Sequence, residues 1–316
     1  MIIEACLVAS LLASLLLSHP SSFPPEDLKF NHDESSRGLE TVYFGTTTIY
    51  FGDSKSGILI DGFFSRPSWG KLAFKKIEPE VARIKNALAC CETVPISAIF
   101  VTHSHHDHAM DAGVVAKESG GKLYGSRSTE LIARASGIGE DVFSYISNKS
   151  QVIVGGFLVT SFSIPHSSIE VCPGKVDEGF SFPARACEFK TDEVFALYIE
   201  HEKGKILVSP SANFSVDALN DLQVDISMVS IAGLASQPLS FVEDYWNESV
   251  RNRGAKLVIP LHWDDFADHS DTNLRPLPFA ADGVSVALDR ILKLAKRDGV
   301  KVAFLPYKKK VKLGDY

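Results

Sequence analysis

The 316-residue chain lacks the patterns of several common protein classes. It has five cysteines and no C-x-x-C pair, which argues against a cysteine-based zinc site. G-x-G-x-x-G, P-loop and G-x-S-x-G motifs are missing, so neither a nucleotide cofactor nor a serine-hydrolase elbow is indicated. The net charge is −7 and the sequence has no basic stripe, which argues against binding to the phosphate backbone of a nucleic acid. We expect a small-molecule substrate and no nucleic-acid partner.

Long hydrophobic runs are also scarce, since residues 5–18 form the main continuous apolar block. This block is short for a membrane span and suits a signal peptide, although Glu4 and the lack of Lys or Arg before it are atypical. A misplaced start or a short buried helix would also explain it. We predict a leader over residues 1–18, with a secreted or periplasmic location if it is a signal and a cytoplasmic one otherwise. No stable membrane span is expected after its removal, and the oligomeric state is open.

The four cysteines beyond the leader form two groups. Cys90 and Cys91 end a helical pattern, where at least one is expected to fill core space. Cys172 and Cys187 bracket a segment that contains glycine and prolines. An exported protein would join them in a disulfide, whereas a cytosolic protein would keep free thiols.

Residues 19–39 are polar and predict a linker or flexible lead, and residues 40–316 predict a single domain. Short β-branched and aromatic runs begin near Glu40, and an amphipathic helix is expected over 76–91. Further strands and helices follow without strict alternation, ending in a strand over 300–307 and a lysine-rich tail. This order favours an α+β fold with two sheets packed face to face and helices outside.

The most informative stretch is V-T-H-S-H-H-D-H, which follows the buried strand P-I-S-A-I-F-V. Imidazole and carboxylate groups are ligands for Zn, Fe and Mn. His103 and His105 share one face of an extended segment, while Asp107 and His108 begin the next helix and face a second point. One loop therefore supplies two neighbouring metal positions. His106, between the two pairs, is expected to face solvent or to stand behind the ligands.

Two more histidines, His166 and His262, each come directly after an apolar strand, as His103 does. Strand ends that meet at one edge of the fold would bring these three side chains together. The remaining histidines lie in polar stretches and are expected at the surface: His19, His32, His201 and His269.

The motif T-H-S-H-H-D-H resembles the H-x-H-x-D-H signature of the metallo-β-lactamase-fold hydrolases, and the resemblance extends from about Glu40 onward. It implies a four-layer αββα sandwich with two mixed sheets. It also implies one metal site of His103, His105 and His166 and another of Asp107, His108 and His262. G-I-L-I-D-G is similar to the family's first motif, in which Asp61 would brace the metal loop. P-L-H-W-D-D-F resembles the broad hydrolase branch rather than the antibiotic-cleaving enzymes.

One position departs from the family. A Gly-Asp pair whose carboxylate bridges two metals is expected after a later strand, but Pro210 and Ser211 stand there. Serine is a weak neutral ligand, so one metal, two metals bridged by water, or metal without turnover would each fit. Asp264 and Asp265 follow His262 and would add a carboxylate to the site or cap a helix.

The implied chemistry is hydrolysis of a small ester, lactone or phosphodiester by a hydroxide on one or two Zn ions, with Fe or Mn as alternatives. Asp107 is the expected catalytic carboxylate, which orients the water and moves its proton. Two alternatives remain: an iron-dependent redox member similar to a sulfur dioxygenase, and a non-catalytic member that binds metal or ligand.

Substrate contacts are harder to place from the sequence. Arg66 and Trp69 would form a pocket wall or belong to a surface turn. The Cys172–Cys187 segment would form a lid whose apolar edge is Phe180 and Phe182, or these two rings would pack under their own loop.

Overall fold

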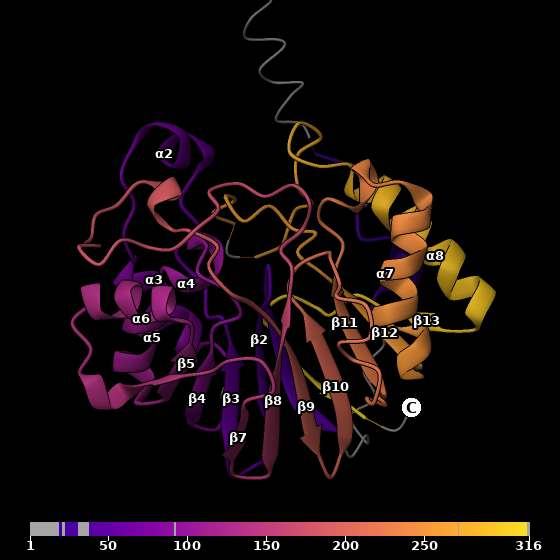
Figure 1. The fold of residues 1–316 in the computed structure, drawn as a ribbon, viewed down its shortest axis with the longest axis horizontal. Coiled ribbons are helices and arrows are strands. Elements are labelled where there is room, and N and C mark those ends of the chain that lie inside the picture. Colours follow the sequence, from indigo (N-terminus) through magenta and orange to yellow (C-terminus); the bar gives the residue numbers. More distant parts are fainter. Residues whose placement is uncertain (1–18, 21–22, 31–37, 92, 271, 315–316) are drawn as a thin grey trace, which may run out of the picture.

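Two seven-stranded β-sheets face each other at the centre of the protein, and helices cover their outer faces (Figure 1). The structure is a computed structural model that describes residues 19–20, 23–30, 38–91, 93–270 and 272–314. The predicted leader, residues 1–18, lies outside the described residues. No helix in the described part of the chain is long and apolar enough to cross a membrane.

The first sheet contains the N-terminal strands and one strand from the C-terminus, in the order β14-β1-β2-β3-β4-β5-β6. Strands β3 to β6 run parallel and the others pair antiparallel. Its strands are β1 (Leu39–Gly45), β2 (Thr48–Gly52), β3 (Gly57–Ile60), β4 (Ile96–Phe100), β5 (Lys122–Gly125), β6 (Phe143–Tyr145) and β14 (Lys310–Leu313).

The second sheet has the order β13-β12-β11-β10-β9-β8-β7, in which β10 to β13 run parallel. Because β9 pairs antiparallel with both neighbours, β8 points the same way as β10, β11 and β12. Its strands are β7 (Gln151–Val154), β8 (Phe157–Ile164), β9 (Val194–His201), β10 (Gly204–Ser209), β11 (Ile226–Ser230), β12 (Leu257–Leu261) and β13 (Lys301–Val302).

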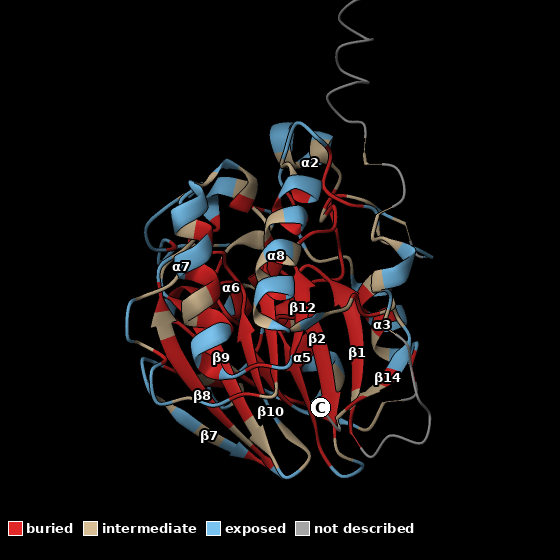
Figure 2. Ribbon diagram, turned by 90° about the vertical axis from the view of Figure 1, so that its right-hand side faces the viewer, coloured by how far each residue is buried: buried red, intermediate tan, exposed pale blue. Residues whose placement is uncertain are grey.

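The helices lie on the two outer faces, with α3, α5 and α6 beside the first sheet and α7 and α8 beside the second (Figure 1). Each turns an apolar face inward and leaves its charged face exposed, which is clear for α8 in Figure 2. Their bounds are α2 (Trp69–Phe74), α3 (Val81–Ala89), α4 (His106–Ala109), α5 (Ala112–Ser119), α6 (Arg127–Ala135), α7 (Leu239–Ser249) and α8 (Val284–Asp298).

Buried aliphatic and aromatic side chains fill the space between the sheets and between the first sheet and its helices. Strands such as β12 and β11 are buried along their whole length because both of their faces are covered, and they therefore lack a polar alternation. The predicted α+β four-layer αββα sandwich with two mixed sheets is confirmed.

Some local predictions were wrong. The expected final strand over 300–307 forms a ladder only at Lys301–Val302, with isolated bridges at Phe304 and Tyr307. The chain has then crossed to the first sheet, where Lys310–Leu313 pairs with β1. The lead segment is not a free linker over residues 23–30, because the Phe23 ring packs 5.3 Å from Trp263 and 5.5 Å from Phe304. Leu28 and Phe30 also pack against the core, and the backbone of this segment exchanges hydrogen bonds with Phe304.

A buried ion pair ties the loops at one end of the sandwich together. The Arg66 guanidinium donates to the Asp264 carboxylate at 2.7 Å and to the carbonyls of Phe44 and Asp265. Arg66 is 2% exposed and Asp264 is fully buried. The second oxygen of Asp264 accepts from the Thr46 amide at 2.7 Å, so the carboxylate is satisfied on both sides.

We predict that Arg66→Met lowers the free energy of unfolding by about 3–5 kcal/mol, because it leaves a buried carboxylate without its counter-charge. Denaturant unfolding measures this effect. Adding Asp264→Asn should recover part of the loss, since it removes the stranded charge. Lys71→Met, which breaks only the exposed Lys71–Glu80 pair, serves as control and should change little. An Arg66→Met protein as stable as the control would contradict this account.

Candidate metal centre

Three histidines converge from the ends of two strands in different sheets. His103 and His105 follow β4, and His166 follows β8. Their ligand-type nitrogens lie within 4.8 Å of one another, and the ring centroids are 4.8–5.1 Å apart. The arrangement is a triangle of imidazoles around a common point.

Two of these rings, those of His105 and His166, have a polar partner at one ring nitrogen. Nε2 of His105 lies 2.9 Å from the Thr191 hydroxyl, and Nδ1 of His166 lies 3.3 Å from the Ser167 carbonyl. In the tautomers that donate at these atoms, the opposite nitrogens, Nδ1 of His105 and Nε2 of His166, are the acceptors. Nε2 of His103 is buried and has no hydrogen-bond partner among the described residues.

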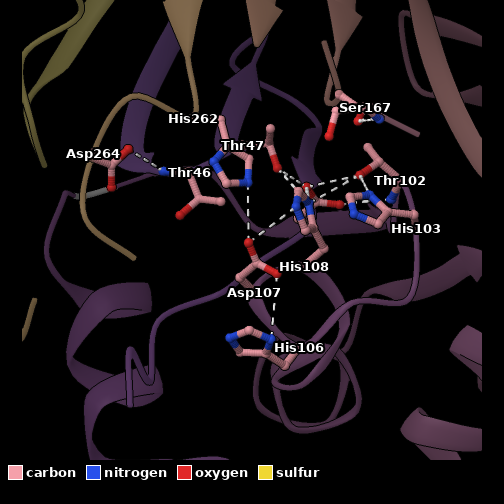
Figure 3. A network of polar contacts seen from close by, with 12 residues as sticks. Thr46, Thr47, Thr102, His103, His106, Asp107, His108, Ser167, His262 and Asp264 are labelled. Atoms are coloured by element: carbon pink, nitrogen blue, oxygen red, sulfur yellow. Dashed lines mark hydrogen bonds and ion pairs between the residues drawn. The ribbon is translucent and has the colours of Figure 1, made fainter. Parts of the chain in front are cut away.

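The second set combines Asp107 and His108 on α4 with His262, which follows β12. Oδ2 of Asp107 lies 3.2 Å from Nε2 of His262 and 3.6 Å from Nε2 of His108. The backbone of His262 is left-handed (φ +55°), and its amide donates to the Thr46 carbonyl. The two sets adjoin, since the rings of His103 and His108 are 3.8 Å apart (Figure 3).

Asp61 braces the loop that supplies most of these side chains. One carboxylate oxygen accepts from the Thr102 amide at 2.7 Å, and the other accepts from Nδ1 of His108 at 2.7 Å and from the Thr47 hydroxyl. Asp61 has a left-handed backbone (φ +59°) and is fully buried. The structure thus places Asp61 directly behind His108 and fixes which nitrogen of His108 faces Asp107.

The electrostatic setting keeps the first set neutral. Burial, helped by the nearby His108 imidazole, holds the pKa of His103 well below its usual range, and burial lowers the pKa of His105 to about 3. Burial also lowers the pKa of His166. A neutral imidazole is the form that binds a metal, so these three residues are competent ligands across the physiological range.

The second set carries the charge. Burial acts to lower the pKa of His262, but the hydrogen bond and charge of Asp107 prevail and raise it. Burial likewise opposes ionisation of Asp107, and the surrounding imidazoles, first His108, nevertheless hold its pKa well below the usual range. Asp107 is therefore an anion among imidazoles, the donor set that a divalent cation completes.

These residues fit a metal ion. The buried, unpartnered nitrogen of His103 would be costly in a site built to stay empty, and coordination would satisfy it. The cluster is a metal-binding arrangement of histidines and one aspartate, and the six side chains are the six expected from the sequence.

At the position where a bridging carboxylate was expected, Ser211 and the nearby Asn213 form hydrogen bonds to the segment that carries His166. The Ser211 hydroxyl accepts from the Ser167 amide at 2.7 Å, and the Asn213 side chain donates to the His166 carbonyl at 2.6 Å. Ser211 is buried. The end of β10 therefore fixes the backbone that presents His166.

The two acidic residues after His262 are used elsewhere. Asp264 pairs with Arg66, and Asp265 accepts from the Ala267 amide at 2.9 Å within a turn, so no helix is capped there. Neither lies in the two ligand sets of the described residues. Arg66 is buried and so does not belong to a surface turn, and the cavity that it lines contains none of the six ligand-set residues. Trp69 donates its indole N–H to Asp265 and packs on Phe266, 5.0 Å away.

The segment between Cys172 and Cys187 is closed by a disulfide, and Cys90 is paired with Cys91. Phe180 and Phe182 pack under their own loop, against each other and against the buried Phe189. The alternative in which they form the apolar edge of a lid is therefore not supported.

His106 takes the second of its two predicted places, behind the ligands, because its side chain is only 15% exposed and lies beside Asp107. His201 differs from its predicted surroundings: its side chain is 3% exposed and lies 3.3 Å from the Asp53 carboxylate, so it is not a surface residue. Thr191 was not foreseen at all, since it is far in sequence from His105 and carries no local signal.

The sequence and the fold were compared with known proteins. Residues 41–141 match the family model of the metallo-beta-lactamase superfamily. No curated protein matches the chain. Among solved structures, Igni18, a novel metallo hydrolase from Ignicoccus hospitalis, is 14% identical with a TM-score of 0.51, over 88% of this chain and 99% of its own.

Two further structures have the same fold. A protein of Veillonella parvula described as a possible metal-dependent hydrolase is 15% identical with a TM-score of 0.53, over 88% of this chain and all of its own. The CmlA beta-hydroxylase E377D mutant is 12% identical with a TM-score of 0.53, over 89% of this chain and 55% of its own. The chain is a protein of the metallo-β-lactamase fold, as its histidine motif indicated.

We predict that Asp61→Asn weakens metal binding about 10- to 100-fold, because the neutral amide no longer fixes and polarises His108. Competition against a chromophoric chelator measures the affinity. Asp53→Asn, which changes a carboxylate that contacts His201 outside the site, is the matched control. Equal affinities for the two variants would refute the role of Asp61.

We also expect the two sets to respond differently to pH. The raised pKa of His262 means that a proton competes with metal from above pH 6.5 downward, so affinity at the second set should fall about tenfold per pH unit below that pKa. The lowered pKa of His105, about 3, means that the first set keeps its metal down to much lower pH. Calorimetric metal titrations between pH 8 and 5 would show two sites at high pH and one at low pH. Parallel loss of both sites would contradict the assignment.

Proposed function

We propose that this protein is a metal-dependent hydrolase that cleaves a small ester, lactone or phosphodiester. The observation that carries the proposal is the convergence of His103, His105 and His166 next to Asp107, His108 and His262. A divalent ion held there, with zinc as the first candidate and iron or manganese as others, supplies a nucleophilic water and polarises a substrate oxygen at neutral pH.

The roles of the chain's own residues follow from their positions. The three neutral imidazoles would hold the first ion, and Asp107 supplies the negative charge of the second set. Oδ2 of Asp107 faces the nitrogens of His108 and His262, so it is the acceptor placed to orient a water and take its proton. Burial of the surrounding loops keeps bulk water from screening these interactions.

Metal-dependent hydrolysis does not require the bridging carboxylate that this chain lacks. Each set already offers three ligands, which is the number that a catalytic zinc site takes from its protein. Ser211 contributes through its hydrogen bond to Ser167 rather than through charge. The named proteins of this fold include both metallo hydrolases and a beta-hydroxylase, so a redox reaction with iron is the second candidate, and metal identity decides between them.

The first experiment is metal analysis by elemental mass spectrometry of the purified chain and of Ser211→Asp. We expect zinc in the wild-type protein, and two ions in Ser211→Asp if the wild type holds only one. Iron as the native ion would move the assignment to redox chemistry. Protein prepared without chelator that holds no metal would refute the proposal.

We further predict that Asp107→Asn lowers hydrolysis of a responsive ester, lactone or phosphodiester at least 100-fold in kcat/KM, because the neutral amide cannot accept the proton of the water. Asp53→Asn, which alters a partly buried acid that contacts His201 outside the site, is the control. Full activity of Asp107→Asn would exclude it as the catalytic carboxylate.

A further inference from the structure

His106 sits inside a cage of aromatic rings. The centroids of Phe63, Phe189 and Phe266 lie 6.2, 6.3 and 5.9 Å from its own, each close to edge-on. Its Nε2 is buried and has no hydrogen-bond partner among the described residues. A phenylalanine would fill such a cage at least as well, so packing alone does not account for a histidine here.

The polar atom that remains is Nδ1, and it points to the metal centre. It lies 3.7 Å from Oδ1 of Asp107 (Figure 3). The other oxygen of that carboxylate, Oδ2, faces His262 and His108. The two oxygens of Asp107 are thus divided between the second ligand set and His106.

This division matters when Oδ2 is engaged. A carboxylate bound through one oxygen can still rotate about its side-chain bonds unless the other oxygen is held. The aromatic cage prevents the His106 ring from swinging away, and the backbone places it one residue before Asp107. Nδ1 is therefore the donor available to lock Oδ1.

We propose that His106 is a positioning residue for Asp107: its Nδ1–H donates to Oδ1 and fixes the orientation in which Oδ2 faces the second ligand set. The separation of 3.7 Å closes to hydrogen-bond length, about 2.8 Å, when Oδ2 is bound. The inference concerns ligand geometry, so it holds whether or not the proposed hydrolysis is the reaction.

The test compares two replacements of His106. His106→Phe suits the cage and removes the donor, whereas His106→Asn places an amide N–H close to the position of Nδ1. His269→Phe, on an exposed histidine, controls for adding a phenylalanine. Far-ultraviolet circular dichroism and unfolding curves check that all variants fold.

The readout is cobalt(II) binding, followed by visible absorption and by chelator competition, which needs no substrate. We expect His106→Phe to weaken the second cobalt equivalent about 10- to 100-fold and to change its absorption band, while the first equivalent keeps its affinity. His106→Asn should stay within about threefold of wild type, as should His269→Phe. A folded His106→Phe with unchanged affinity and spectrum would overturn the proposal, and so would an Asn variant as impaired as the Phe variant.

Hydrolysis is then assayed on the same variants as a separate question. Loss of cobalt affinity in His106→Phe supports the positioning role even if no ester, lactone or phosphodiester is cleaved. Failure of the proposed function and failure of this inference are therefore told apart.

Discussion

The carboxylate of Asp61 is the interaction on which the site depends. It lies in the loop after β3, and it accepts hydrogen bonds from Thr102, the second residue beyond β4, from Thr47 in the turn between β1 and β2, and from the imidazole of His108. A buried carboxylate is tolerated only when its charge is fully hydrogen-bonded, so these partners have little freedom to move. The loop that carries His103, His105, Asp107 and His108 therefore leaves the first sheet in one fixed direction.

The second sheet is joined to this frame by a different buried charge. Arg66, from the same loop as Asp61, reaches across to Asp264 two residues beyond His262. Gly45 has to be a glycine beside this pair, because a Cβ there would lie 1.9 Å from an Arg66 nitrogen and 2.6 Å from an Asp264 oxygen. The strained backbone of His262 is held by this arrangement and by its bond to Thr46. Asp264, which the sequence suggested as an additional metal ligand, therefore helps to position His262 instead.

Without a bridging aspartate, Asp107 is the one carboxylate in the two ligand sets of the described residues. The negative charge lies at the second set and the first set is neutral, so the two positions differ in electrostatic character although they share one loop. Ser211 and Asn213 at the end of β10 stabilise the backbone around His166. The neutral Ser211, which anchors the His166 loop through Ser167, thus stands where an aspartate would bind the metal directly.

The sequence by itself determined the ligand-bearing segments and most of the strands and helices. The reason is local: runs such as P-I-S-A-I-F-V bury both faces, and a histidine directly after such a run must stand at a sheet edge. The tertiary structure decided which side chains support the ligands. Arg66 and Asp264 are 198 residues apart, and Thr191 and His105 are 86 apart, so no periodic pattern connects them. It also decided that His106 is enclosed, because its cage of Phe63, Phe189 and Phe266 comes from three distant loops that meet only in the folded chain.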